Sequence, residues 1–236
     1  VSFASTGTFN APLLKDAAGT LLTLSDPAQT VITGGLSQID NARFVLSNGA
    51  TFNQITDTEY FATSSAIANS TIMSATGSGT ILDASSLTKI DSYADHWGTN
   101  TRTISASAGG QIDLSGVTLL RGGSGNSGGA DSVRISSVTG GTVNLTNLQQ
   151  IDRYVTFATA APAYTLPSLV SAGAVNYELP DAATLSLPQL LTQNGGGFAL
   201  TSGTLVDAPK LQTLNNAYVS FASTGTFNAP LLKDAA

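Results

Sequence analysis

The residue types best suited to recognition or catalysis gather in one part of the chain, residues 59–140. The stretch SYADHWGTNTR holds the single histidine and the single tryptophan, His96 and Trp97, with Tyr93 and Arg102 nearby. An exposed aromatic ring beside hydrogen-bonding groups can stack on a sugar or anchor a protein partner. These four residues are therefore a candidate binding site for a glycan or a partner chain. The competing interpretation is that Trp97 covers a corner of the fold and that His96 is solvated.

Ionisable residues also recur at one position of successive sequence repeats. Four of them form this row: Glu59, Asp91, Arg121 and Asp152. If the repeats stack at about 4.8 Å, Arg121 lies between two carboxylates. Clustered acids beside an arginine can bind calcium or act as acid and base in the cleavage of a polysaccharide. A ladder of surface ion pairs produces the same pattern, and we favour that interpretation.

A third row combines carboxylates and amides just before an inward apolar position: Asp83, Asp113, Asn144, Asp207 and Asn228. Such side chains, stacked at strand spacing, can hydrogen-bond to one another, so we predict a structural polar ladder. We expect no bound metal and no cofactor. The chain has no cysteine, one histidine and scattered carboxylates, and it lacks a phosphate-binding glycine loop and a serine-hydrolase motif.

An internal repeat determines how these rows are positioned. Residues 1–18, VSFASTGTFNAPLLKDAA, recur unchanged as residues 219–236, which sets a period of 218 residues. Within that period an apolar anchor recurs at intervals of 19 to 32 residues and defines nine sub-repeats. The anchors are Leu14, Leu36, Ile55, Leu87, Val117, Leu148, Leu169, Leu190, Leu211 and Leu232. A fixed internal period predicts a solenoid, a propeller or an array.

Short alternating runs separated by Gly, Pro, Ser and Asn make up each sub-repeat, which predicts strands and turns without a substantial helix. We therefore predict an all-β fold, a parallel β-helix (β-solenoid) of about nine coils per 218-residue repeat. A leucine-rich repeat has a similar period, but its Asn-bearing motif is absent, and a propeller blade needs a longer repeat. The prolines expected at one corner of the coils are Pro12, Pro167, Pro188, Pro209 and Pro230.

The domain organisation follows from the period. Residues 1–218 form one repeat unit and residues 219–236 begin the next, so we expect the chain to be a window on a longer polypeptide. Three consecutive sub-repeats between Ile55 and Leu148 are longer than the others by about ten residues. Insertions at one corner of stacked coils would form a lateral ledge within residues 59–140, and such a ledge is often the binding surface of a repeat protein.

The composition restricts the partners. Charged residues make up 10% of the chain, against roughly 25% in an ordinary soluble domain. Nine Lys plus Arg face fifteen Asp plus Glu. Nucleic acids and anionic membranes require clustered cations, so we expect neither as a partner. No apolar run approaches the roughly 20 residues of a membrane span.

Glycine-punctuated, weakly charged coils such as GGTVNLTNLQQIDRYVTF and GGQIDLSGVTLL resemble the right-handed parallel β-helix regions of very large bacterial surface and extracellular proteins. That resemblance implies an extracellular or cell-surface location and a role as a stalk, an adhesin shaft or a fibre of a biofilm matrix. The unchanged recurrence of residues 1–18 favours a fibre, because the coils of adhesin shafts usually diverge.

The sequence therefore favours a non-enzymatic structural component of an extracellular fibre, sheath or matrix, whose partner is a further copy of the repeat. Two alternatives stay open. One is an adhesin shaft or glycan-binding module that uses the ledge, with a polysaccharide as its partner. The other is a polysaccharide lyase or hydrolase of the β-helix type that uses Asp91, Arg121 and Asp152.

Overall fold

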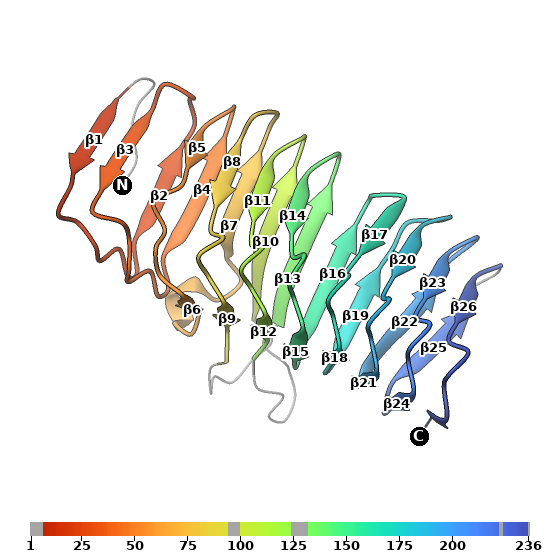
Figure 1. Ribbon diagram of the computed structural model, residues 1–236. Helices are drawn as coiled ribbons and strands as arrows, with labels where there is room; N and C mark the ends of the chain where they lie inside the picture. Colours follow the sequence, from red (N-terminus) through yellow and green to blue (C-terminus); the bar gives the residue numbers. More distant parts are fainter. Residues whose placement is uncertain (1–6, 94–99, 124–131, 222–223, 236) are drawn as a thin grey trace.

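The structure, a computed structural model, describes residues 7–93, 100–123, 132–221 and 224–235, which wind into one stack of coils (Figure 1). The strands of successive coils pair in parallel. The prediction of an all-β, parallel β-helix is confirmed. Among the described residues, the one helical element is a short 3-10 turn, η1 (Ser65–Ile67).

Each coil passes through three faces in turn. Face 1 is a nine-stranded sheet of β2 (Leu21–Leu24), β4 (Arg43–Ser47), β7 (Thr71–Thr76), β10 (Thr101–Ser107), β13 (Ser132–Val138), β16 (Val155–Thr159), β19 (Val175–Glu178), β22 (Gly196–Leu200) and β25 (Tyr218–Phe221). Face 2 contains β1 (Thr8–Ala11), β3 (Thr30–Thr33), β5 (Thr51–Phe52), β8 (Ile81–Asp83), β11 (Gln111–Asp113), β14 (Thr142–Asn144), β17 (Ala163–Thr165), β20 (Thr184–Ser186), β23 (Leu205–Asp207) and β26 (Thr226–Asn228). Face 3 is an eight-stranded sheet of β6 (Glu59–Phe61), β9 (Lys89–Asp91), β12 (Leu119–Arg121), β15 (Gln150–Asp152), β18 (Ser171–Ala172), β21 (Thr192–Asn194), β24 (Thr213–Asn215) and β27 (Asp234–Ala235).

The corner between faces 2 and 3 explains the paired leucines of the sequence. In LPQL, the N–H of Leu190 donates to the carbonyl of Leu187 at 3.2 Å and closes a β-turn with Pro188 at its second position. Proline suits that position because its fixed φ matches the turn. Both leucines are buried. The predicted corner prolines all lie in turns of this kind: Pro12, Pro167, Pro188, Pro209 and Pro230.

The corner between faces 1 and 2 depends on residues with positive φ. Thr139 and Gly140 have φ of 51° and 76°, and the N–H of Gly141 donates to the carbonyl of Val138 at 3.0 Å. Two successive positive φ values define a type I′ turn. Gly141 is required for another reason, because a Cβ there would lie 2.3 Å from the backbone of Ala106 in the preceding coil. The coils approach too closely at this point for a side chain.

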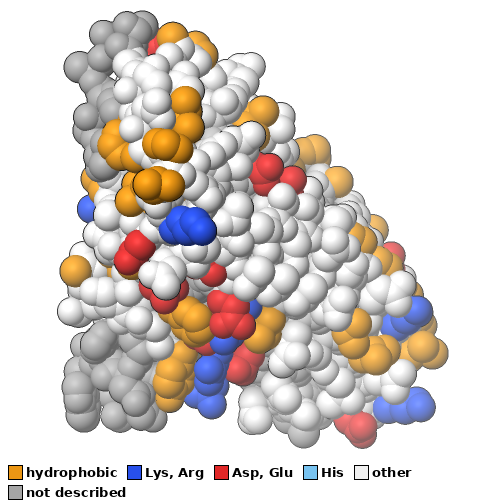
Figure 2. Space-filling model, turned by 60° about the vertical axis from the view of Figure 1, so that its left-hand side comes forward, with side chains coloured by type: hydrophobic (Ala, Val, Ile, Leu, Met, Phe, Trp, Pro, Cys, Tyr) orange, Lys and Arg blue, Asp and Glu red, His pale blue; other side chains and the backbone are white. Residues whose placement is uncertain are grey.

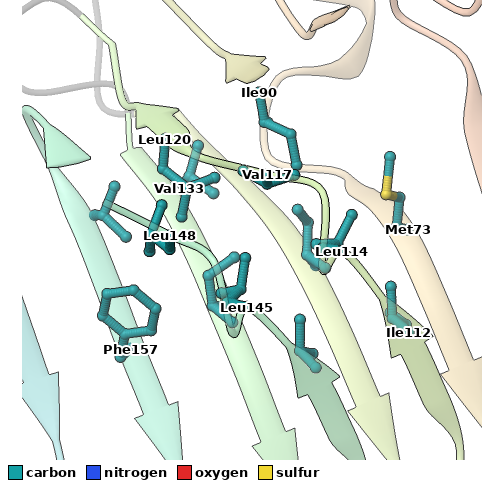
Figure 3. Close-up of a cluster of buried hydrophobic side chains, with 14 of the residues drawn as sticks. Met73, Ile90, Ile112, Leu114, Val117, Leu120, Val133, Leu145, Leu148 and Phe157 are labelled. Carbon is teal, nitrogen blue, oxygen red and sulfur yellow. The ribbon is translucent and has the colours of Figure 1, made fainter. Parts of the chain in front are cut away.

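The interior is a continuous apolar column. Strand β13 alternates buried and part-exposed residues, so every second side chain points inward. Inward side chains of the three faces meet in the middle of the coil (Figure 3). Those labelled in the figure are Met73, Ile90, Ile112, Leu114, Val117, Leu120, Val133, Leu145, Leu148 and Phe157. Burial of side chains of this size contributes roughly 1.5–3 kcal/mol each.

A stack of aromatic rings fills the column in the C-terminal coils. Phe157, Tyr177 and Phe198 are register partners on face 1, with successive ring centroids 5.7 and 5.1 Å apart and nearly parallel planes. Burial raises the pKa of Tyr177 above its usual range. Its hydroxyl has no hydrogen-bond partner among the described residues, and a buried hydroxyl in that state costs roughly 1–3 kcal/mol. The ring of Tyr177 therefore stabilises the column, and its hydroxyl opposes that effect.

An ion pair joins coils on the outside of face 1. Arg134 on β13 donates from Nη1 and Nη2 to the two carboxylate oxygens of Glu178 on β19, at 2.9 and 2.6 Å, and so spans the intervening strand β16. The hydrogen bonds from Arg134 hold the pKa of Glu178 below its usual range. The pair is the bidentate kind that fixes geometry as well as charge.

Glu178→Gln is expected to reduce the loss of stability at acid pH. Because the folded pKa of Glu178 is lowered, its contribution is present above the unfolded pKa of about 4.3 and is lost as the pH falls through the folded value. The carboxylate is 55% exposed, so the contribution is below about 1 kcal/mol. Urea unfolding at neutral pH and at about pH 3 measures it. Arg134→Gln should remove the same pH-dependent part, and two different pH profiles would contradict the assignment.

Candidate functional site

A group of ionisable side chains lies on face 3, held by β9, β12 and β15. The strand register places Arg121 beside Asp91 on one side and Asp152 on the other. Arg121 Nη1 lies 3.5 Å from Asp91 Oδ2, and Arg121 Nε lies 3.2 Å from Asp152 Oδ2. Side chains of both signs gather in one patch of the surface shown in Figure 2, most of which is otherwise uncharged. The structure thus brings together three of the four residues of the predicted charge ladder.

Glu59, the fourth residue of that ladder, lies elsewhere. It is in register with Lys89, and Phe61 occupies the position expected for it beside Asp91. The prediction was wrong because β6 begins four residues after the anchor Ile55, whereas β9 begins two residues after Leu87. The side chain still joins the group, since Lys89 Nζ lies 3.9 Å from its Oε2.

Asp91 is the most enclosed member of the group. Asp91 is 4% exposed. Lys89 Nζ lies 3.3 Å from its Oδ2, and the N–H of Tyr93 donates to its Oδ1 at 2.9 Å. With Arg121 at its other side, the carboxylate faces two cations and a backbone donor. Such a carboxylate anchors the end of β9 and the chain that follows it. Its burial leaves little access for a substrate.

Tyr93 covers the charged group from the corner. The guanidinium carbon of Arg121 lies 4.3 Å from the centre of its ring, and that of Arg153 lies 5.9 Å away. These are cation–π contacts. The ring therefore already contacts guanidinium groups, which reduces the surface it offers to a sugar. His96 and Trp97, the other aromatic members of the predicted binding site, lie outside the described residues.

Arg102 was predicted as a surface residue of the binding site, and the structure contradicts this. Strand β10 begins at Thr101, so its alternation turns Arg102 toward the core, where it is 0% exposed. One of its terminal nitrogens donates to the carbonyl of Ser64 at 3.4 Å, at the residue that caps η1. Arg102 thus joins the connection before β7 to the core, and the strand starts earlier than the polar sequence SYADHWGTNTR indicates.

The long connections all lie at the corner between faces 3 and 1. They comprise residues 62–70, 92–100 and 122–131 in three consecutive coils, whereas residues 153–154 make the same connection in the next coil. Figure 1 shows η1 at this corner, on the same side of the stack as β6, β9 and β12. Residues 62–70, the long connection that is described in full, thus lie at one edge of face 3. Residues 94–99 and 124–131 of the other two connections lie outside the described residues.

A polar hollow of about 420 Å³ lies beside β15, β18 and β21. Its lining includes Asp152, Arg153 and Asn194, together with Gly173 and Ala174 of the following coil. The small residues leave space that longer side chains would fill. The short run SAGA at 171–174 is the one sequence signal for this hollow, and composition alone does not distinguish it from an ordinary turn.

The polar ladder lies along the outer edge of face 2. Asp113 is in register with Asp83 and Asn144, and Asp207 with Asn228. The amide of Asn144 donates to Asp113 Oδ1 at 3.1 Å, and the amide of Asn228 donates to Asp207 Oδ1 at 2.6 Å. These hydrogen bonds join successive coils, as expected for a structural row.

Asp113→Ala is expected to lower the free energy of unfolding by about 1–2 kcal/mol. Asp113 Oδ1 accepts from the N–H of Ser115 at 2.9 Å, which closes the corner of its own coil, and from Asn144 of the next. Asp113→Asn keeps an oxygen at that place and should lose less than half as much. Equal losses in the two variants, measured by urea unfolding, would show that charge rather than hydrogen bonding is involved.

Within the described ranges, no group of three or more His, Cys, Asp and Glu side chains is placed to hold a metal ion. In the same ranges, no helix has the length and apolar character to cross a membrane. Comparisons with protein-family models, with curated proteins and with solved structures found no match to this chain.

Proposed function

We propose that this chain is a structural, non-enzymatic building block of an extracellular fibre, sheath or matrix made of identical β-solenoid repeats. Its role is mechanical, and its partner is a further copy of the same repeat. The resemblance of its coils to those of large bacterial surface proteins supports the extracellular setting.

One observation carries the proposal: the described parts of the two copies of the segment, residues 7–17 and 225–235, occupy equivalent places in the first and last coils. The sequence TFN lies in a face-2 strand in both copies, β1 and β26. The N–H groups of Leu14 and Leu232 then close the same β-turn. Asp16 and Asp234 follow, and both pair on face 3. A segment that takes one path at both ends can be shared by two successive units.

Each copy of the segment also has a neighbouring coil on one side only, and the side differs between the two copies. Phe9 pairs with Val31 of the following coil, and Phe227, the same residue of the repeat, pairs with Val206 of the preceding coil. Each phenylalanine is half-buried, whereas Val206 has a coil on both sides and is 1% exposed. In an array, one phenylalanine would have both neighbours and would become buried like Val206.

Continuous stacking would also protect the edges of the sheets. The outermost strands of an isolated stack present unpaired backbone groups, which invite aggregation. In an array these edges are internal, except at the ends of the filament. The low charge of the chain, in which 10% of residues are Asp, Glu, Lys or Arg, lets neighbouring filaments approach without strong repulsion.

Chains of one, two and three tandem repeats are expected to be rods whose length increases by about 43 Å per repeat, since nine coils advance about 4.8 Å each. Electron microscopy and small-angle scattering measure this increment. As a matched control, Phe227→Asp, which replaces the phenylalanine at the junction of a two-repeat chain, should introduce a bend at the midpoint. Particles whose length does not grow with repeat number, or which form separate beads, would contradict the proposal.

The rival hypotheses receive less support. Of the four residues considered for glycan binding, Arg102 lies in the core and Tyr93 packs against Arg121. For polysaccharide cleavage, Asp91 is buried and paired with Lys89 and Arg121. The polar hollow beside Asp152 is the feature that a glycan-binding surface would use.

A further inference from the structure

The last described coil has an edge that no further described strand covers, and the sequence of this edge also occurs at the start of the chain. Among the described strands, β25, β26 and β27 pair with the preceding coil and with no following one. Ala235 on this edge is exposed, whereas Ala17, its counterpart in the first copy, is 8% exposed beneath the second coil. What covers this edge can therefore be deduced from the other end of the same molecule.

At the N-terminal end, residues 19–40 cover the segment. Strand β3 pairs with β1 in the register Thr8↔Thr30, and Gln38 pairs with Asp16. Backbone hydrogen bonds complete the contact, among them those from Thr30 N–H to Gly7 O at 3.0 Å, Gly34 N–H to Leu14 O at 2.9 Å and Ser37 N–H to Lys15 O at 2.9 Å. The equivalent carbonyls of the second copy belong to Gly225, Leu232 and Lys233, in the last coil.

We propose that residues 19–40 of a second copy of this chain bind to the open edge of the last coil, with β26 beside β3 of the second copy in the register Thr226↔Thr30. Residues 225–235 of one copy thereby take the place that residues 7–17 occupy on the other. This exchange rests on the proposed structural role and specifies the contact between successive copies. If the two copies are separate chains, the exchange is a domain swap of identical segments. If they are consecutive repeats of one polypeptide, the same contact forms because the chain continues directly from one repeat into the next.

The first coil is suited to replacement. An apolar cavity of about 270 Å³ lies between it and the second coil, and its lining includes Phe9, Leu14 and Val31. Phe9 and Leu14 of the first coil therefore border space that no side chain fills. An incoming segment of the same sequence makes the same contacts, so the exchange loses no contact energy. Protein concentration and the covalent link then decide which copy is bound.

Identical substitutions in the two copies of the segment should have opposite effects on assembly. Phe9→Asp weakens the binding of the chain's own first coil and frees residues 19–40 for a second copy. We expect the protein concentration at which half of the chains are assembled to be about tenfold lower than for the wild type. Phe227→Asp weakens the incoming segment and should raise that concentration at least about tenfold. Sedimentation velocity over a concentration series measures both effects, and circular dichroism monitors the β-structure of the remaining coils.

Shifts in the same direction for Phe9→Asp and Phe227→Asp would overturn the exchange. A general loss of stability, or general aggregation, acts alike at both ends of the stack. The sequence around the two positions is identical, so neither local propensity nor the introduced charge differs between the variants.

Disulfide trapping tests the register in the full chain. The chain has no cysteine, so Thr30→Cys combined with Thr226→Cys introduces its only two thiols, at opposite ends of the stack (Figure 1). Paired strands lie about 4.8 Å apart, which suits a disulfide. Oxidation should give a ladder of covalently linked multimers on a non-reducing gel. Thr8→Cys combined with Thr226→Cys should stay unlinked, because the exchange displaces residues 1–18.

These outcomes separate the exchange from the proposed function. Links that form through the Thr8→Cys and Thr226→Cys pair alone would show that intact first coils stack on last coils. That result would support the proposed fibre and would contradict the exchange of segments. If neither pair forms links, the exchange is wrong, and the rod lengths of the tandem chains then decide the proposed function separately.

Discussion

Tyr177→Ala is expected to lower the free energy of unfolding by about 3–5 kcal/mol, the usual cost of deleting a buried aromatic side chain. Tyr177 lies between Phe157 and Phe198 in the interior, with ring centroids 5.7 and 5.1 Å away. Its removal leaves a cavity between two coils and interrupts the aromatic stack. Urea unfolding followed by circular dichroism measures the change.

Tyr177→Phe is the matched control and should act in the opposite direction. It keeps the ring and removes a hydroxyl that is buried and has no partner in the described part of the chain. The free energy of unfolding should rise by about 1 kcal/mol. If this variant were as unstable as Tyr177→Ala, the hydroxyl would be an essential hydrogen-bonding group and the assignment of stability to the ring would be wrong.

Asp91→Ala is expected to cost about 2–4 kcal/mol, toward the lower end of the range for breaking a buried ion pair. The carboxylate is 4% exposed, and its loss leaves Lys89 and Arg121 without their shared counter-ion. Both cations are part-exposed, at 25% and 31%, so water recovers some of the loss. The N–H of Tyr93 also loses its acceptor.

Asp152→Ala is the control for that prediction. Asp152 is the carboxylate on the other side of Arg121 and is 42% exposed, so its removal should cost less than about 1 kcal/mol. Urea unfolding of both variants in the same buffer measures the difference. Equal costs would show that burial does not determine the strength of this ladder.

The coil architecture could be predicted because the turns leave a direct mark in the sequence. In the corner from Leu187 to Leu190, the first and fourth residues of one β-turn point inward, and Pro188 occupies the position where proline is favoured. A spacing of three between apolar residues then recurs once per coil. The same reasoning placed Asp113 next to Asn144, because parallel strands keep equivalent residues side by side.

The site was harder to predict because it depends on where each strand begins. Glu59 was assigned two residues too far along its strand, since the two extra residues before β6 have no distinctive composition. Arg102 was assigned to the surface because charge usually indicates exposure, yet the alternation of β10 turns it inward. The burial of Asp91 depends on contacts between coils, and local sequence does not contain that information.

The direction of the hydrogen bonds has a consequence for how such a fibre bears load. The peptide chain winds around the axis, and the bonds between neighbouring coils run along it. Tension therefore acts on hydrogen bonds and stacked side chains in series, and the weakest interface between coils yields first. A released coil of 21 residues gives up about 4.8 Å of stack and supplies about 70 Å of extended chain. The proposed fibre would lengthen in steps under force, as single coils unfold. The released coils would refold onto the stack when the force is removed.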